Sequence, residues 1–190
     1  MTSTTPTPTT IFPTKSSQRL PPAEPLSPVP LRILGVDPGL DRTGYGVIEL
    51  SNGTGPRLVE AGLIRTPSGD LLPRRLAAVA KELKELITQH RPNLLAVEDL
   101  YSCYKTPKPA ILMGHVRGVV LGTAALADIP VFSYLPTRVK QAVVGQGHAS
   151  KLQVARLVRM RLNLKDSQVP ADVTDALAVA LCHADALRQP

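Results

Sequence analysis

The feature that most constrains the fold is a change in the spacing of apolar residues near residue 66. Before it lie three short runs typical of strands, at Arg32 to Val36, Thr43 to Leu50 and Arg57 to Arg65. Turn residues such as Pro38-Gly39 and Ser51-Asn52-Gly53 separate them. Strands joined this closely predict an antiparallel meander that precedes the first helix.

Beyond residue 66, helical spacing alternates with two more strand-like runs. Apolar residues between Leu72 and Ile87 share one helical face, and we expect Asp70 to cap this helix and Arg91-Pro92 to end it. The other expected elements are strands at Leu94 to Val97 and Val131 to Tyr134, and helices at about 107–127, 136–144, 150–162 and 171–187. This order predicts an α/β fold with a central five-stranded mixed sheet, three antiparallel strands and then two parallel ones, flanked by helices.

The first 30 residues differ from the rest of the chain. They hold 8 of the 19 prolines, many Ser and Thr, and few large apolar residues. Such a segment buries too little apolar surface to offset its ordering entropy, so 1–30 is predicted to be a disordered Pro/Ser/Thr-rich tail. Residues 31–190 are predicted to form one domain, and we expect neither a secretory signal nor a membrane-spanning run.

Charge and cysteine content narrow the class of partner. The net charge is +7, and Lys15 and Arg19 against Glu24 leave only one of these charges in the tail. The domain is therefore basic, which makes nucleic acid the leading candidate for a partner, although some basic proteins bind none. Cys103 and Cys182 are far apart and form no CxxC motif, which favours a reducing cytosol and unpaired thiols.

Acidic residues end two of the predicted strands and begin the last helix. Asp37 follows the first strand, Glu98 follows the fourth, and Asp172 and Asp175 lie one helical turn apart after Pro170. Each has a structural alternative, because Asp precedes Pro-Gly in many turns and acids suit the first turn of a helix. Glu98 has no turn role, and Asp99 beside it should point to the opposite face of the sheet.

The four acids would converge if the first and fourth strands were neighbours and the last helix crossed their ends. Four carboxylates so close cannot all stay ionised without cations. Two divalent ions would supply this charge, and oxygen ligands favour Mg²⁺ or Mn²⁺. Such a pair of ions catalyses phosphodiester hydrolysis. Arginine or lysine side chains are the alternative source of positive charge.

Glycines recur at two places where close approach is expected. Gly114, Gly118 and Gly122 form one ridge of the helix at 107–127, which suits either packing on the sheet or a tight contact between subunits. Gly44 and Gly46 remove side chains from the second strand beside Asp37, which would admit DNA or a metal ligand.

Four motifs in order give the chain a resemblance to a known family. The segments "LGVDPGLDRTGYGVIE", "AVED", "VKQAVVGQGHASK" and "ADVTDALAVA" closely resemble RuvC-type Holliday-junction resolvases of the RNase H-like (integrase) superfamily, over nearly all of residues 32 to 187. The resemblance implies an RNase H-like fold and a cytoplasmic, nucleoid-associated bacterial enzyme. It also implies a homodimer that binds a four-way DNA junction, alongside a branch-migration helicase complex, and makes paired nicks that leave 5′-phosphate and 3′-hydroxyl ends.

The same resemblance assigns roles to individual residues. It makes Asp37, Glu98, Asp172 and Asp175 the catalytic and metal-binding acids, holding two Mg²⁺ or Mn²⁺ ions per subunit. Its basic DNA-binding positions match Lys140 and Lys151, and its junction-centre aromatic matches Tyr101. DNA contacts by Lys105 and Lys108 are expected from "YSCYKTPKPA", although this stretch departs from the family pattern. The alternatives are solvated surface lysines and a core tyrosine.

Other classes of protein fit the sequence less well. "GYGVIE" places Glu49 where a dinucleotide-binding fingerprint needs its third glycine, and "GQGHASK" is not a phosphate-binding P-loop. The remaining alternatives are a related RNase H-like nuclease that processes RNA and a non-catalytic protein that only binds junctions. The second of these would not need four converging acids.

Overall fold

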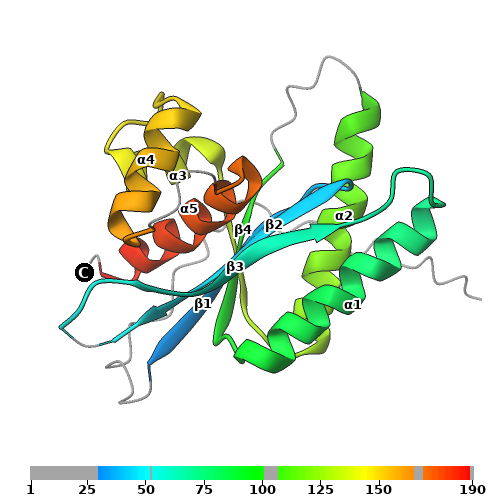
Figure 1. Ribbon diagram of the computed structural model, residues 1–190, viewed down its shortest axis with the longest axis horizontal. Coiled ribbons are helices and arrows are strands. Elements are labelled where there is room, and N and C mark those ends of the chain that lie inside the picture. Colours follow the sequence, from blue (N-terminus) through cyan, green and yellow to red (C-terminus); the bar gives the residue numbers. More distant parts are fainter. Residues whose placement is uncertain (1–29, 52, 101–106, 165–168, 189–190) are drawn as a thin grey trace, which may run out of the picture.

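The computed structural model describes residues 30–51, 53–100, 107–164 and 169–188, which form a five-stranded sheet between two layers of helices (Figure 1). The strands are β1 Leu31–Asp37, β2 Arg42–Leu50, β3 Arg57–Arg65, β4 Leu94–Glu98 and β5 Val131–Tyr134. Their order is β3-β2-β1-β4-β5. Strands β1 to β3 are antiparallel, whereas β4 and β5 run parallel to β1. The predicted mixed sheet is confirmed.

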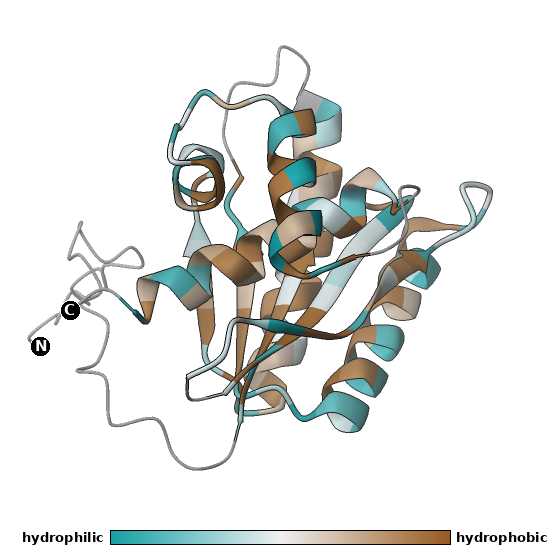
Figure 2. Ribbon diagram, turned by 60° about the vertical axis from the view of Figure 1, so that its left-hand side comes forward, coloured by the Kyte–Doolittle hydropathy of each residue, from teal (hydrophilic) through white to brown (hydrophobic). Residues whose placement is uncertain are grey.

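The helices divide between the two faces of the sheet. The helices are α1 Leu72–His90, α2 Pro107–Leu126, α3 Pro136–Val144, α4 Lys151–Arg161 and α5 Ala171–Ala186. Buried residues of α1 and α2 form one core with one face of the strands, and those of α3, α4 and α5 form a second core on the other face. Hydrophobic residues run along the inner strands between these layers (Figure 2).

The alternation of side chains along β1 and β4 sends the two strand-end acids to the α5 face. Ile33 belongs to the core on the α5 side, while Leu34 and Val36 belong to the core under α1 and α2. Asp37 lies an even number of residues from Ile33, so it faces α5. In β4, Leu94 and Ala96 face α5, and Glu98 follows them with the same period.

Three glycines allow α5 to lie unusually close to the sheet. A Cβ on Gly44 would stand 1.9 Å from the carbonyl oxygen of Asp172, and one on Gly35 would stand 2.1 Å from that of Ala176. A Cβ on Gly46 would stand 2.3 Å from Leu177 Cδ2. The space left by Gly44 and Gly46, which we expected to admit DNA or a metal ligand, is filled by α5 itself.

The first helix begins differently from the sequence prediction. Leu71, not Asp70, is the N-cap residue, and no side chain caps the helix. The Asp70 amide instead donates to the Pro67 carbonyl in a turn. The predicted end is right, because Arg91 adopts a left-handed conformation directly after His90 and Pro92 follows.

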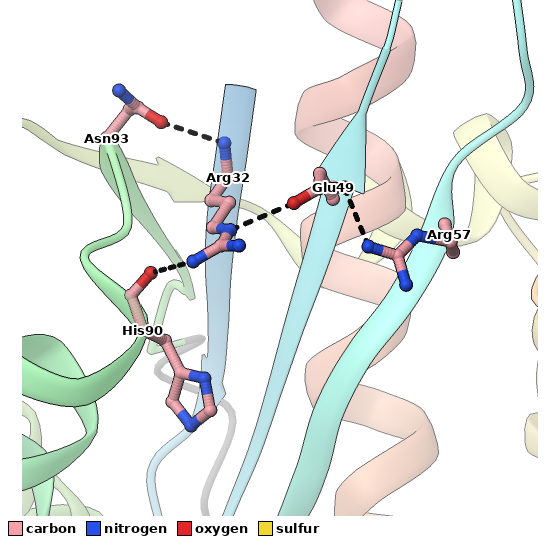
Figure 3. A network of polar contacts seen from close by, with 5 residues as sticks. All are labelled: Arg32, Glu49, Arg57, His90 and Asn93. Atoms are coloured by element: carbon pink, nitrogen blue, oxygen red, sulfur yellow. Dashed lines mark hydrogen bonds and ion pairs between the residues drawn. The ribbon is translucent and has the colours of Figure 1, made fainter. Parts of the chain in front are cut away.

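An ion-pair network joins the strands at the end of the sheet remote from Asp37 (Figure 3). Glu49 on β2 is almost buried and accepts from Arg32 Nε at 3.0 Å and from Arg57 Nη2 at 2.8 Å. Arg32 also donates to the His90 carbonyl, which ties β1 to the end of α1. The hydrogen bonds from Arg57 and Arg32 lower the pKa of Glu49.

Replacing Glu49 with Gln is expected to destabilise the fold by about 1–2 kcal/mol at pH 7. A carboxyl with a lowered pKa stabilises the folded state above its ordinary pKa and loses that contribution as the pH falls through the lowered value. The difference between Glu49→Gln and the unmodified protein should therefore shrink below about pH 4. Urea unfolding at pH 7 and pH 3.5 measures it, with exposed Glu60→Gln as the control. Equal stability of all three proteins at pH 7 would contradict the prediction.

Helix α2 leaves much of its apolar surface uncovered. Its Lys108–Leu126 segment is long and apolar enough to cross a membrane by length and composition, with a mean hydropathy of 1.4, contrary to our expectation of no such run. Only 17% of this apolar stretch is buried in the protein. Ile111 and Leu126 are exposed, and a Cβ on Gly118 or Gly122 would meet nothing within 4 Å. Of the two alternatives for the glycine ridge, packing on the sheet is therefore wrong for these two glycines.

Candidate active site

Two strand ends and one helix bring the four predicted acids together. Strands β1 and β4 are parallel neighbours in register, with Val36 beside Val97, so Asp37 and Glu98 leave the sheet side by side. Gly44 lies opposite Asp37 on β2 and touches the backbone of Asp172, which places the first turn of α5 over the same end of the sheet. Asp175 follows one turn later on this helix.

The electrostatics of Asp37 show how close the acids lie. Burial, followed by the negative charges of Asp175, Glu98 and Asp172, raises the pKa of Asp37 to about 7, while Lys151 opposes the shift. Burial and Asp175 also raise the pKa of Glu98, against Lys151 and Lys140. Among the described residues, neither the Asp37 nor the Glu98 carboxylate has a hydrogen bond or an ion pair.

Basic side chains hold the two acids on α5. Arg42 Nε lies 3.0 Å from Asp172 Oδ2, and Lys151 Nζ lies 2.8 Å from Asp175 Oδ2. Asp175 is the main cause of a raised pKa of Lys151. The alternative in which basic residues neutralise the acids is therefore observed for this pair, whereas Asp37 and Glu98 keep no such partner in the described part of the chain.

The carboxylate oxygens of the four acids suit a hard divalent cation, although they are not arranged as a coordination shell in this structure. The partly buried carboxylates of Asp37 and Glu98, unpartnered within the described residues, supply the oxygen ligands that Mg²⁺ and Mn²⁺ prefer. Within the described ranges, no three Asp, Glu, His or Cys side chains are arranged to hold one ion. For Asp172 and Asp175 to become ligands, they would have to exchange Arg42 and Lys151 for the cation.

The structure places the remaining predicted residues as follows. Lys140 on α3 and Lys151 at the start of α4 lie near the acids, as their effect on Glu98 shows. Lys108 is exposed in the first turn of α2, and Tyr101 and Lys105 lie outside the described residues. Asp99 pairs with Arg117 at 3.0 Å and takes no part in the acid cluster.

Sequence reasoning missed two residues of the site. The sequence analysis did not identify Gly35 as part of the site. The signal was present, because Gly35 is the one small residue of the apolar strand β1 and lies two residues before Asp37 on the same face. Arg42 was not predicted to contact Asp172, because 130 residues separate them in the sequence and only the packing of α5 on β2 joins them.

Comparison with known proteins identifies the family. The family model described as "Crossover junction endodeoxyribonuclease RuvC" matches residues 33–183. The chain belongs to the RuvC family. A RuvC from Rhodopirellula baltica is 49% identical over 79% of this chain and 84% of its own length, and one from Pelotomaculum thermopropionicum is 47% identical over 80% and 92%. The predicted family and endonuclease class are thereby confirmed.

Solved structures agree with this RuvC assignment. Thermus thermophilus RuvC in complex with a Holliday junction substrate matches with a TM-score of 0.78 and 35% identity over 83% of this chain and 95% of that one. The yeast mitochondrial Holliday junction resolvase Ydc2 matches with a TM-score of 0.62 but 15% identity, which shows a shared fold alone. The RNase H-like architecture predicted from the motifs is confirmed.

Proposed function

We propose that this protein resolves Holliday junctions by paired, symmetric nicks in strands of like polarity, leaving 5′-phosphate and 3′-hydroxyl ends. The observation that carries the proposal is a pair of carboxylates, Asp37 and Glu98, at the ends of two parallel strands beside Asp172 and Asp175 in a RuvC-family chain. Neither of the two has a partner among the residues that the structure describes. The junction substrate is supported by the complex of the 35% identical T. thermophilus RuvC with a Holliday junction. The positive net charge of +7 suits DNA.

The four carboxylates would hold two Mg²⁺ or Mn²⁺ ions per subunit. Bound there, the ions would supply an activated water and stabilise the departing 3′ oxygen. The rigid ends of β1 and β4 hold Asp37 and Glu98 in place for this task. Lys140 and Lys151 neutralise phosphate charge next to the acids, and Lys151 is released for this role when Asp175 takes up a cation.

Contacts outside the acid cluster complete the proposal. Tyr101 stacks on bases near the junction centre, and Lys105 and Lys108 bind phosphates around it. The protein works on the bacterial nucleoid in the cytoplasm, alongside a branch-migration helicase complex. These assignments rest on the family motifs, with Lys108 exposed as a phosphate contact requires.

The active form is a homodimer that buries the exposed face of α2. This face combines apolar side chains such as Ile111, 57% exposed, with Gly118 and Gly122, which leave room for another backbone. A monomer would leave this apolar helix in water, and such patches mark interfaces. A second copy supplies a matching face by two-fold symmetry, and it also provides the second active site that paired nicks require.

Replacing Gly118 with Glu is expected to weaken the dimer at least about tenfold, because a charged side chain would enter the closest part of the contact. The helix itself should survive, since Glu favours helix more than Gly does. Light scattering coupled to size-exclusion chromatography measures the mass against concentration. Gly69→Glu, in an exposed turn, is the control, and a Gly118→Glu protein that dimerises like it would refute the interface.

The proposed function is tested by cleavage of a synthetic four-way junction against linear duplex and single-stranded RNA of the same sequence. We expect symmetric nicks in the junction alone with Mg²⁺ or Mn²⁺, and none in EDTA. Cleavage of linear duplex at the same rate would overturn junction selectivity. Preferred cleavage of RNA would favour an RNA-processing nuclease, and binding without cleavage in either metal would favour a protein that only binds junctions.

A further inference from the structure

An open hollow of about 600 Å³ lies next to the acid cluster on its β2–β3 side. Its lining residues come from the start of β2 and the residue before it, and from the end of β3 and the segment after it, namely Asp41, Arg42, Arg65, Thr66, Pro67 and Ser68. Arg42 and Arg65 face each other directly across the β2–β3 ladder. Like charges opposite each other on neighbouring strands are unfavourable, so the fold gains nothing from this pair.

The wall of the hollow is held by buried contacts. Arg75 on α1, only 8% exposed, donates to Thr66 Oγ1 at 2.9 Å and pairs with Asp41. Thr66 also donates to the Leu40 carbonyl through its hydroxyl and to the Asp41 carbonyl through its amide. These bonds fasten the two segments together and offset the charge of Asp41, so the positive charges of Arg42 and Arg65 dominate the hollow.

The two arginines differ in their partners. Arg42 is 56% exposed and holds Asp172 through its Nε, at 3.0 Å from Oδ2. Arg65 is exposed and has no acidic partner within the described residues. One arginine therefore connects the hollow to a predicted metal ligand, while the other leaves its charge available to an anion.

We propose that Arg42 and Arg65 bind a backbone phosphate of the DNA beside the cleaved bond, and that Arg42 leaves Asp172 to do so. This inference rests on the proposed function, because it takes DNA as the ligand and Asp172 as a metal ligand. Phosphate in the hollow would then free Asp172 for a divalent ion, so DNA binding and metal binding would strengthen each other. Arg42 is a positioning residue that keeps Asp172 paired until DNA arrives.

The first experiment measures Mn²⁺ binding without DNA, by titration calorimetry on the full-length protein. An exposed ion pair of this kind competes weakly, so Arg42→Ala should bind Mn²⁺ about two- to fivefold more tightly than the unmodified protein. Arg65→Ala should bind it unchanged, as should Lys84→Ala, which removes an exposed charge from α1 on the other face of the sheet. Equal or weaker Mn²⁺ binding by Arg42→Ala would overturn the exchange of partners.

The second experiment measures the affinity for a four-way junction in EDTA against salt concentration, where no cleavage occurs. Each lost phosphate contact lowers the slope of log affinity against log salt by about 0.9. Arg42→Ala and Arg65→Ala should each show this loss, whereas Arg42→Lys and Lys84→Ala should keep the full slope. Full slopes for both alanine variants would overturn the phosphate site. Neither the Mn²⁺ affinity nor the salt slope depends on cleavage, so failure of this inference can be distinguished from failure of the proposed nuclease function. Circular dichroism confirms that each variant is folded.

Discussion

Replacing Asp37 with Asn is expected to lower the rate of junction cleavage by about a thousandfold or more, with junction binding retained. Asp37 is the acid whose pKa responds to all three of the others, so it lies where their charges meet. The amide keeps the size of the side chain but removes the negative charge that would hold a cation. Single-turnover cleavage in Mg²⁺ and in Mn²⁺, with binding measured in EDTA, tests this prediction.

The stability of Asp37→Asn distinguishes a chemical effect from unfolding. A carboxyl whose pKa is raised to about 7 by burial and neighbouring acids opposes folding once it ionises. The folded state then loses stability as the pH rises from the ordinary pKa through the raised one. Without metal at pH 8, the Asn variant should therefore melt at an equal or higher temperature than the unmodified protein.

Asp99→Asn is the matched control for Asp37→Asn. Asp99 directly follows Glu98 at the end of β4, but it pairs with Arg117 and lies outside the acid cluster. Its replacement should therefore change the cleavage rate by less than about threefold. Cleavage by folded Asp37→Asn at the rate of the control would show that Asp37 is not part of the active site.

Replacing Gly44 with Ala is expected to lower the free energy of unfolding by about 2–4 kcal/mol. The added Cβ would lie 1.9 Å from the Asp172 carbonyl oxygen, and the three nearest atoms that it meets all belong to the backbone of α5. The helix must then move away from the sheet. Urea unfolding gives the loss of stability, and junction cleavage should fall further than the folded fraction because Asp172 moves with the helix.

Gly55→Ala is the control for this substitution. A Cβ on Gly55 would meet nothing within 4 Å, so this variant should unfold within about 0.5 kcal/mol of the unmodified protein. If Gly44→Ala matched Gly55→Ala in both stability and cleavage, the close packing of α5 on β2 would not be what positions Asp172.

The positions of Asp37 and Glu98 follow from local sequence patterns. Short, continuous apolar runs predicted β1 and β4. Side chains alternate between the two faces along any strand, and this alternation decides which face each acid points to. The order of strands and helices predicted a mixed sheet because short turns join antiparallel strands, whereas parallel strands need a helical crossover. These features depend on residues that are close together in the sequence, so they can be predicted from the sequence alone.

Contacts between distant segments were decided only by the tertiary structure. The sequence marked Gly44 and Gly46 as places of close approach, but the identity of the approaching group, α5, depends on how a helix more than 120 residues later packs on the sheet. The same packing pairs Arg42 with Asp172. Such pairs carry no periodic or spacing signal, because burial and charge select them only after the whole chain has folded.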